Sequence, residues 1–279
     1  MPEYVFNRQE CRLHYPAVMG ILNLTPDSFS DGGAFLDPSV AIERVLAMVE
    51  EGAQVIDLGG ESTRPGSKGV SEQDELSRVL PVLEKLPRGG FMISIDTTKP
   101  AVARAALQAG AHMINDVSGG NPELLELAKR YGAGFVLMHA QGSPEDMQDD
   151  PAYDDALSEI RAFFDQQKEG LANLSLPRVW IDPGIGFGKT LEHNLELMGN
   201  LSALRDDAWG TLLGSSRKSW IDGLCDAPDP RDRMGGSIAS ALCALSHGVE
   251  IIRAHDVRET VQALKVAKEL ALCDKTSIV

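Results

Sequence analysis

The hydrophobic positions of this chain fall into short blocks that recur along its whole length. Eight blocks are found, at residues 17–22, 54–60, 91–95, 111–115, 134–139, 178–182, 211–214 and 249–255. Each block is long enough for a strand and too short for an ordinary helix. Because the blocks are nearly continuous in apolar residues, rather than alternating with polar ones, they are typical of parallel strands buried on both faces.

Longer amphipathic stretches separate the strand blocks. PSVAIERVLAMVEEGA and SEQDELSRVLPVLEKL are two of them, with apolar residues at helical spacing. Asp37-Pro38 and Asn121-Pro122 place a capping side chain before a proline, a common helix start, and glycines such as Gly52 follow the expected helix ends. Strands that alternate with helices indicate βαβ units. We therefore predict an α/β fold, a single (β/α)8 TIM barrel that forms one domain over residues 1–279, with a doubly wound open sheet as the alternative.

The charge balance limits the classes of partner. Lys and Arg total 26 against 41 Asp and Glu, which gives a formal net charge of −15. Such a chain repels phosphate backbones and anionic membrane surfaces, so neither nucleic acid nor membrane is an expected partner. Any local group of cations stands against this background and therefore indicates a specific anion.

The cysteines and the chain start bear on location. The four cysteines are far apart and include no Cys-x-x-Cys pair, which argues against a zinc ribbon or a disulfide framework. The opening segment MPEYVFNRQECRLHYP has no apolar core of a signal peptide, and no apolar run approaches the ~18–20 residues of a membrane helix. We expect a soluble protein of the reducing cytoplasm.

Polar side chains stand where the strand blocks end. In chain order they are Asn23, Glu61-Ser62-Thr63-Arg64, Asp96, Asn115-Asp116, His139, Asp182, Ser216-Arg217-Lys218-Ser219, Arg253 and His255. Helix capping would explain one or two of them, but not one set per strand. Because the carboxyl ends of all eight barrel strands meet at one mouth, these side chains predict one active site there.

The set divides by charge. Asp96, Asn115 and Asp182 supply acceptors, and a carboxylate can bind the adjacent N–H and NH2 donors of a 2-amino-4-oxo pyrimidine ring, as in guanine or a pterin. The cations point to phosphate or diphosphate; they are Arg64, Arg217, Lys218, Arg253 and His255. Asn23 offers a hard oxygen suited to Mg2+ that is held partly by substrate phosphates.

Three further segments have alternatives that the sequence leaves open. The polar segments TPDSFSDGGAF and GGESTRPGSKGVSE are either lids over the mouth or plain surface loops, and CDAPDPRDR (225–233) is expected to be a surface loop. DPGIGFGKT (182–190) misses the Walker spacing, because proline stands where the first glycine is required. Met138 and Phe187 are either core or the apolar faces around a flat ring, and His139 is either packing or a substrate contact.

Eight segments, in this order, resemble the motifs of the dihydropteroate synthases. They are GILNLTPDSFSDGG (20–33), IDLGGESTRPG (56–66), SIDTTKP (94–100), INDVSGG (114–120), LMHAQGSPEDMQDDPAYDD (137–155), DPGIGFGKT (182–190), GSSRKS (214–219) and IIRAHDV (251–257). The resemblance runs from about residue 17 to 265. It departs from the family pattern at Ala140, where a second Met is common, and at Trp220, a variable place.

The resemblance implies that the protein condenses 6-hydroxymethyl-7,8-dihydropterin diphosphate with 4-aminobenzoate in folate biosynthesis. It also implies that the protein is a homodimer and a target of sulfonamides. It implies that the pterin is bound by Asp96, Asn115, Met138, Asp182, Phe187 and Lys218. It implies that the diphosphate is bound by Asn23, Thr63, Arg253 and His255, and that Asn23 also binds Mg2+. It implies that the aminobenzoate is bound by Phe29, Thr63, Arg64, Pro65, Lys218 and Ser219. The implied catalytic residues are Asp27, Arg64, Lys218, Arg253 and His255.

Two other functions are weighed against this one. A methyltransferase module that binds methyltetrahydrofolate in the same kind of barrel shares the pterin-binding acids, but needs neither the Arg-Lys-Ser and Arg-x-His cations nor the first loop. A catalytically inactive pterin-binding barrel is expected to have lost part of the polar mouth, and every member is present here.

Overall fold

The computed structural model describes residues 3–25, 37–62, 66–67, 69–142, 146–206 and 208–276. Five predicted site residues lie outside the described residues: Asp27, Phe29, Thr63, Arg64 and Pro65. Within the described part no helix combines the length and the apolar character that crossing a membrane requires.

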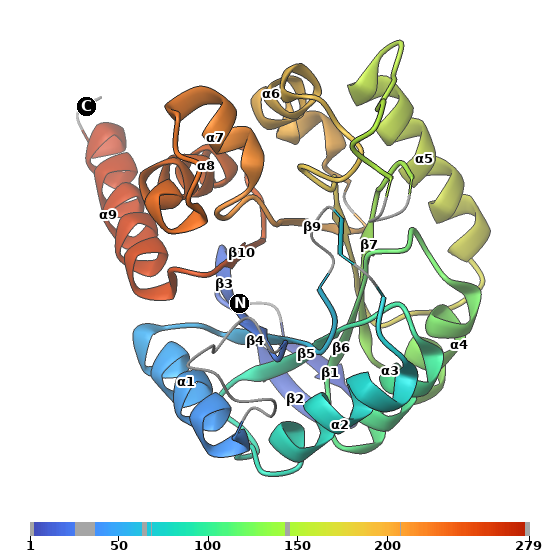
Figure 1. Ribbon diagram of the computed structural model, residues 1–279. Helices are drawn as coiled ribbons and strands as arrows, with labels where there is room; N and C mark the ends of the chain where they lie inside the picture. Colours follow the sequence, from blue (N-terminus) through green and yellow to red (C-terminus); the bar gives the residue numbers. More distant parts are fainter. Residues whose placement is uncertain are drawn as a thin grey trace.

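Eight parallel strands close into a barrel, as the strand blocks predict. Around the barrel the order is β10-β3-β4-β5-β6-β7-β8-β9, with the helices outside the ring (Figure 1). The strands are β3 (Ala17–Asn23), β4 (Val55–Gly59), β5 (Met92–Asp96), β6 (Met113–Asp116), β7 (Gly134–Met138), β8 (Val179–Asp182), β9 (Gly210–Leu213) and β10 (Ile251–Ala254). The (β/α)8 barrel is confirmed, and the open sheet is excluded because β10 pairs with both β9 and β3.

Several helices begin or end at residues that the sequence marks. They are α1 (Pro38–Glu51), α2 (Glu72–Leu83), α3 (Pro100–Gln108), α4 (Pro122–Tyr131), α5 (Ala156–Leu171), α6 (Leu191–Gly199), α7 (Ser219–Cys225), α8 (Met234–Ser246) and α9 (Val257–Thr276), with 3-10 turns η2 (Leu201–Leu204) and η3 (Pro230–Arg233). The side chain of Asp37 caps α1 and that of Asn121 caps α4. Gly52 ends α1 in the left-handed region, where glycine is the least strained residue.

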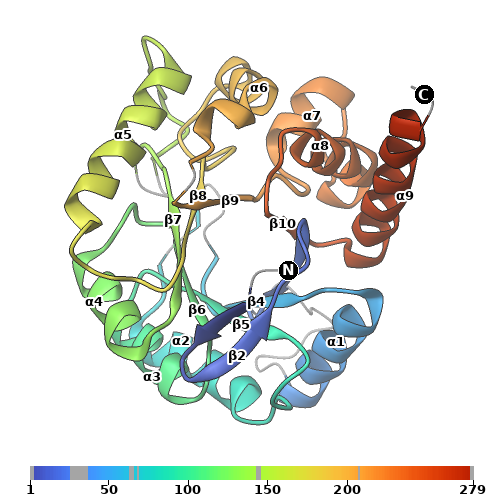
Figure 2. The same cartoon turned by 180° about the vertical axis from the view of Figure 1, so that it is seen from behind.

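A short hairpin that the sequence analysis did not identify closes the amino-terminal end of the barrel. Strands β1 (Glu3–Phe6) and β2 (Gln9–Arg12) pair antiparallel and cross that end (Figure 2). Phe6 is fully buried, and its ring lies 5.9 Å from that of Trp180 on β8. The hairpin turns at Asn7 and Arg8, both at positive φ without a glycine, so the usual turn signal is missing.

The side chains that point into the barrel are apolar toward the amino ends of the strands and polar toward the carboxyl ends. The inner cluster includes Met92 on β5, Trp180 on β8 and Ile251 on β10. Side chains two residues apart on a strand share a face, so the inward series continues from these residues to Asp96, Asp182 and Arg253 at the mouth. The apolar lower barrel thus supports a ring of charged groups at the carboxyl ends of the strands.

Candidate active site

One large cavity, of about 660 Å³, opens at the carboxyl ends of the strands. Its walls bring together predicted site residues that are up to 232 positions apart in the chain. They are Asn23, Asp96, Phe187, Lys218, Ser219, Arg253 and His255. Asp182 is buried beside this wall, since a methyl group added at cavity-lining Gly214 would lie 3.3 Å from its Oδ2. The predicted convergence on one mouth therefore holds for these eight residues, while Thr63 and Arg64 lie outside the described part of the chain.

Arg253 forms the centre of a charged network in the cavity floor. Its Nε donates to Oδ2 of Asp57 at 2.6 Å, and its Nη2 donates to Oδ2 of Asp96 at 2.8 Å. The Nδ2 of Asn115 donates to the same Asp57 oxygen at 3.0 Å. The sequence analysis assigned the acids and the cations to different parts of the ligand, but Arg253 lies among the acids. A buried carboxylate requires a nearby partner charge, and one guanidinium here serves two carboxylates.

Burial determines the proton affinities of these groups. It raises the pKa of Asp96 to about 7, against the opposing effect of Arg253, and nearby Asp57 adds to the rise. It also raises the pKa of Asp182, although Lys218 opposes the change. Oδ1 of Asp57 and Oδ1 of Asp96 are buried and have no hydrogen-bond partner among the described residues. A buried acceptor without a partner is costly, so the oxygen of Asp96 in the cavity wall is well suited to a ligand donor.

Lys218 and Phe187 form one apolar and cationic wall. Nζ of Lys218 lies 4.5 Å from the centre of the Phe187 ring and donates to the carbonyl oxygen of Ile185. Burial lowers the pKa of Lys218 to about 8, while Asp182 opposes the change. A flat ring that enters here would meet the aromatic face of Phe187 and the ammonium donor of Lys218.

The rim on the side of β9 and β10 holds His255 against Ser216. The backbone nitrogen of His255 donates to Oγ of Ser216 at 3.2 Å, and Nδ1 lies 3.1 Å from the same oxygen. Arg217, predicted as part of the anion-binding group, lines the cavity, but its guanidinium is paired with Asp256, with Nε 2.9 Å from Oδ2. Its charge is therefore already matched within the chain.

Met138 and His139 lie behind the cavity wall. Met138 is 2% exposed and is absent from the cavity surface formed by the described residues. His139 is buried against Phe163 and Tyr153, with Nδ1 3.1 Å from Nζ of Lys189. Burial, with Lys189 next in effect, lowers the pKa of His139 to about 3. His139 is therefore a packing residue, the first of the two alternatives.

Three residues of the site were not identified from the sequence. Asp57 lies inside the IDLGG block and was read as part of its apolar run. It is two residues from both Val55 and Gly59, so its side chain shares their face of the strand and points into the barrel. Lys189 is 2% exposed, and Nζ donates to the carbonyl oxygen of Phe187 at 3.0 Å. Arg233 ends the predicted surface loop 225–233; the loop is mostly exposed, but Arg233 is buried and lines the cavity.

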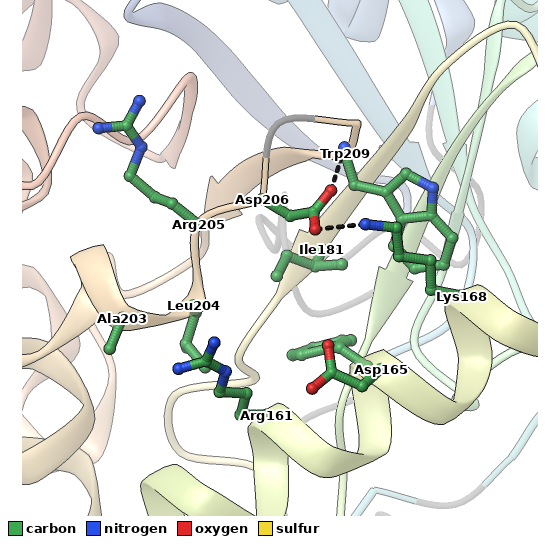
Figure 3. A pocket seen from close by; sticks show the side chains of 10 residues that line it. Arg161, Asp165, Lys168, Ile181, Ala203, Leu204, Arg205, Asp206 and Trp209 are labelled. Atoms are coloured by element: carbon green, nitrogen blue, oxygen red, sulfur yellow. Dashed lines mark hydrogen bonds and ion pairs between the residues drawn. The ribbon is translucent and has the colours of Figure 1, made fainter.

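A second cavity, of about 50 Å³, lies on the outside of the barrel between α5 and the segment before β9 (Figure 3). Lys168 points at Asp206 there, and the two form an ion pair. Arg161 and Asp165 line the same crevice from α5. Its small size and mixed charge set it apart from the site at the mouth.

Comparison with known proteins places this arrangement in a family. The family model described as pterin binding enzyme matches residues 19–255. The chain is 46% identical over 258 residues to a dihydropteroate synthase of Synechocystis, covering 91% of this chain and 89% of that one. It is 45% identical over 260 residues to the enzyme of Escherichia coli K12, with 92% of each chain covered.

Solved structures agree. A Yersinia pestis dihydropteroate synthase in a sulfonamide complex superposes with a TM-score of 0.89 at 43% identity, over 97% of this chain and 99% of that one. The Xanthomonas albilineans dihydropteroate synthase with 4-aminobenzoic acid superposes with a TM-score of 0.89 at 40% identity, over 97% of this chain and 98% of that one. The Thermus thermophilus dihydropteroate synthase in complex with 6HMPPP superposes with a TM-score of 0.83 at 37% identity, over 97% of this chain and 100% of that one. The chain therefore belongs to the pterin-binding enzymes and, among them, to the dihydropteroate synthases.

Proposed function

We propose that this chain condenses 6-hydroxymethyl-7,8-dihydropterin diphosphate with 4-aminobenzoate to give 7,8-dihydropteroate and diphosphate. The related structures that hold 4-aminobenzoic acid and 6HMPPP support both substrates. Within this chain, the observation that carries the proposal is the floor in which Arg253 joins Asp57 and Asp96 beside Asn115. This floor offers acceptors for a pterin edge and a cation for a phosphate within one cavity.

The pterin ring is proposed to lie against this floor. Asp96, Asn115 and Asp182 would accept from its N–H and NH2 groups, and Lys218 would donate to its ring acceptors. Phe187 would cover one face, and Met138 would pack behind the ring. The raised pKa of Asp96 is consistent with a carboxyl that ionises fully when ligand donors replace the missing partner of Oδ1.

The diphosphate is proposed to lie toward β3 and β10, near Asn23, Thr63, Arg253 and His255. The 4-aminobenzoate would lie at the outer side, against Phe29, Thr63, Arg64, Pro65, Lys218 and Ser219, with Asp27 completing the first loop. Five of these residues lie outside the described part of the chain. Asn23, Lys218, Ser219, Arg253 and His255 line the cavity and are therefore accessible to substrate.

The reaction breaks the C–O bond between the pterin methylene and the diphosphate and forms a C–N bond to the arylamine. The pterin ring delocalises charge at the methylene carbon, so a loose displacement, with diphosphate departing first, is favoured. Asp96 and Asp182 would stabilise the cationic ring, and Arg253 and His255 the departing anion. The arylamine attacks as a neutral nucleophile and loses one proton afterwards, so a dedicated strong base is not required.

Mg2+ is part of the proposal. No group of three or more His, Cys, Asp or Glu among the described residues could hold a metal. Asn23 instead offers one amide oxygen in the cavity wall, which suits Mg2+ because this ion usually keeps waters and binds substrate phosphates. When bound, Mg2+ would neutralise charge on the leaving diphosphate.

The assembly and the location complete the proposal. We propose a homodimer, for which exposed apolar side chains on several outer helices offer contacts; they include Leu46 on α1, Leu195 on α6, Leu224 on α7, Met234 on α8, and Val266 and Leu270 on α9. Light scattering of the purified chain would test it, and a monomer at micromolar concentration would contradict it. We also propose that residues 1–279 act as one domain and that the protein works in the cytoplasm.

The test is a reconstitution. The purified chain is given pterin diphosphate, 4-aminobenzoate and MgCl2, and diphosphate release and dihydropteroate are both measured. Release that needs all three components, and that a sulfonamide suppresses, supports the synthase. Binding of a pterin without turnover would indicate an inactive pterin-binding barrel, and selective binding of methyltetrahydrofolate would indicate the methyltransferase alternative.

A further inference from the structure

Asp57 lies beneath the cavity, fully buried in the middle of β4. A single oxygen, Oδ2, accepts both from Nε of Arg253 at 2.6 Å and from Nδ2 of Asn115 at 3.0 Å. We propose that Asp57 is a positioning residue of the synthase site, whose Oδ2 fixes Arg253 and Asn115 where they bind the pterin diphosphate. The inference rests on the proposed function and names a residue for which neither the motifs nor the comparisons give a role.

The strand order shows why one side chain can do this. Around the barrel β4 is separated from β10 by β3 and from β6 by β5. Arg253 on β10 and Asn115 on β6 therefore belong to strands that do not pair with β4. Asp57 reaches both by extending into the barrel interior, so one oxygen links side chains from two separated strands.

The contacts determine orientation as well as place. A guanidinium is a rigid planar fork, so acceptors at two of its nitrogens fix its plane. Arg253 has these acceptors in Asp57, at Nε, and Asp96, at Nη2. If the acceptor at Nε were lost, Arg253 could turn about its remaining contact. For Asn115, donation from Nδ2 determines which end of the amide faces away from Asp57.

The alternative is that Asp57 matters only through its negative charge. Charged groups that interact with Asp96 or Arg253 are plentiful here: Glu75 on α2, Asp96 on β5, Asp116 on β6, Asp182 on β8, Lys218 after β9 and Arg253 on β10. A charge effect depends weakly on where the charge sits over one bond length. A hydrogen-bonding effect depends strongly on the position of the accepting oxygen.

Two substitutions separate these explanations. Asp57→Asn removes the charge but can keep one oxygen at the place of Oδ2, where it accepts from both donors. Asp57→Glu keeps the charge but moves the carboxylate by one methylene. We expect Asp57→Glu to lower kcat/KM for pterin diphosphate roughly 10- to 150-fold, the effect of losing a hydrogen bond to a charged group. Asp57→Asn should lower kcat/KM for pterin diphosphate clearly less than Asp57→Glu does. The KM for 4-aminobenzoate should change little in both variants.

The matched control is Glu250→Gln. Glu250 also accepts from an arginine, since Nη2 of Arg178 lies 2.8 Å from its Oε1 and 3.0 Å from its Oε2, but it precedes β10 and therefore lies at the end of the barrel opposite the cavity. Its substitution should lower the unfolding temperature without the change in KM for pterin diphosphate. Activities are compared per folded protein, with the folded fraction taken from circular dichroism.

The outcomes are distinct. The positioning role is supported if Asp57→Asn is more active than Asp57→Glu, and overturned if the order is reversed or if both variants behave alike. If the parental chain itself releases no diphosphate, the proposed function fails. The positioning role is then judged from crystal structures of the two variants. The role is supported if Arg253 and Asn115 keep their parental positions in Asp57→Asn and are displaced in Asp57→Glu. Any other result overturns it.

Discussion

Replacing Arg253 with methionine tests whether the charged floor of the cavity serves the chemistry. Methionine fills much of the same volume but donates nothing, so Asp57 and Asp96 lose the donor that stands 2.6 Å and 2.8 Å from them. Two effects are expected. The fold loses stability because two buried carboxylates lose their ion-pair partner, and the reaction slows because the departing diphosphate loses a cation.

The magnitudes are large enough to be separated. Removing one partner of a buried ion pair costs about 3–5 kcal/mol of stability, which in a chain of this size lowers the unfolding temperature by roughly 6–20 °C. Folding stabilities are about 5–15 kcal/mol, so the variant should still fold at 25 °C unless the parent is near the lower limit. Loss of one preorganised donor costs about 2.7–4 kcal/mol of barrier, or a 100- to 1,000-fold decrease in kcat.

The assay is diphosphate release at saturating substrates, with thermal unfolding measured on the same sample. Arg178→Met is the matched control. The Arg178 side chain is 17% exposed, against 18% for Arg253, and it also pairs with a carboxylate, with Nη2 2.8 Å from Oε1 of Glu250. Arg178 precedes β8 and therefore lies at the other end of the barrel, so Arg178→Met should lower stability and leave kcat/KM at the parental value.

An Arg253→Met chain that is folded and turns over at the parental rate would refute the reasoning. Equal losses of kcat in the Arg253→Met and Arg178→Met variants would refute it as well, because the loss would then come from weakened folding and not from the cavity.

Three further predictions concern the scaffold. Burial, followed in effect by the charge of Arg88, lowers the pKa of His112 from 6.5 to about 4. Between these pH values the unfolded chain binds more protons than the folded chain, so stability falls as the pH drops from 6.5 to 4. His112→Gln should remove up to about 3 kcal/mol of this fall in urea unfolding, and an unchanged pH dependence would exclude His112 as the cause. Phe6→Ala should cost about 3–5 kcal/mol in the same measurement, with KM values unaltered, and a variant as stable as the parent would show that the hairpin does not support the barrel floor. At Gly184, φ is +68° and an added methyl group would lie 1.9 Å from the carbonyl oxygen of His139, so Gly184→Ala should impair both stability and pterin affinity. Gly199→Ala, with open space around the added methyl group, is the control, and equal behaviour of the two variants would contradict the steric argument.

The pattern of the chain by itself determined the eight strands and their alternation with helices, whereas the closure of the sheet was shown by the pairing of β10 with β9 and β3. Eight apolar blocks separated by amphipathic stretches leave few ways to bury every strand, and caps such as Asp37 mark where helices begin. Polar residues at the strand ends also predicted where the site lies, because parallel strands deliver their carboxyl ends to one face. Both inferences depend on local order along the chain, which a sequence displays directly.

Tertiary structure decided the rest. The sequence could not show that Arg253 lies between Asp57 and Asp96, because these contacts span 196 and 157 positions and depend on the stagger of the closed barrel. Nor could it show that Arg217 is neutralised by Asp256, or that the hairpin of Phe6 packs on Trp180. Pairing between distant side chains is set by strand register and interior packing, and a linear pattern of residue types contains neither.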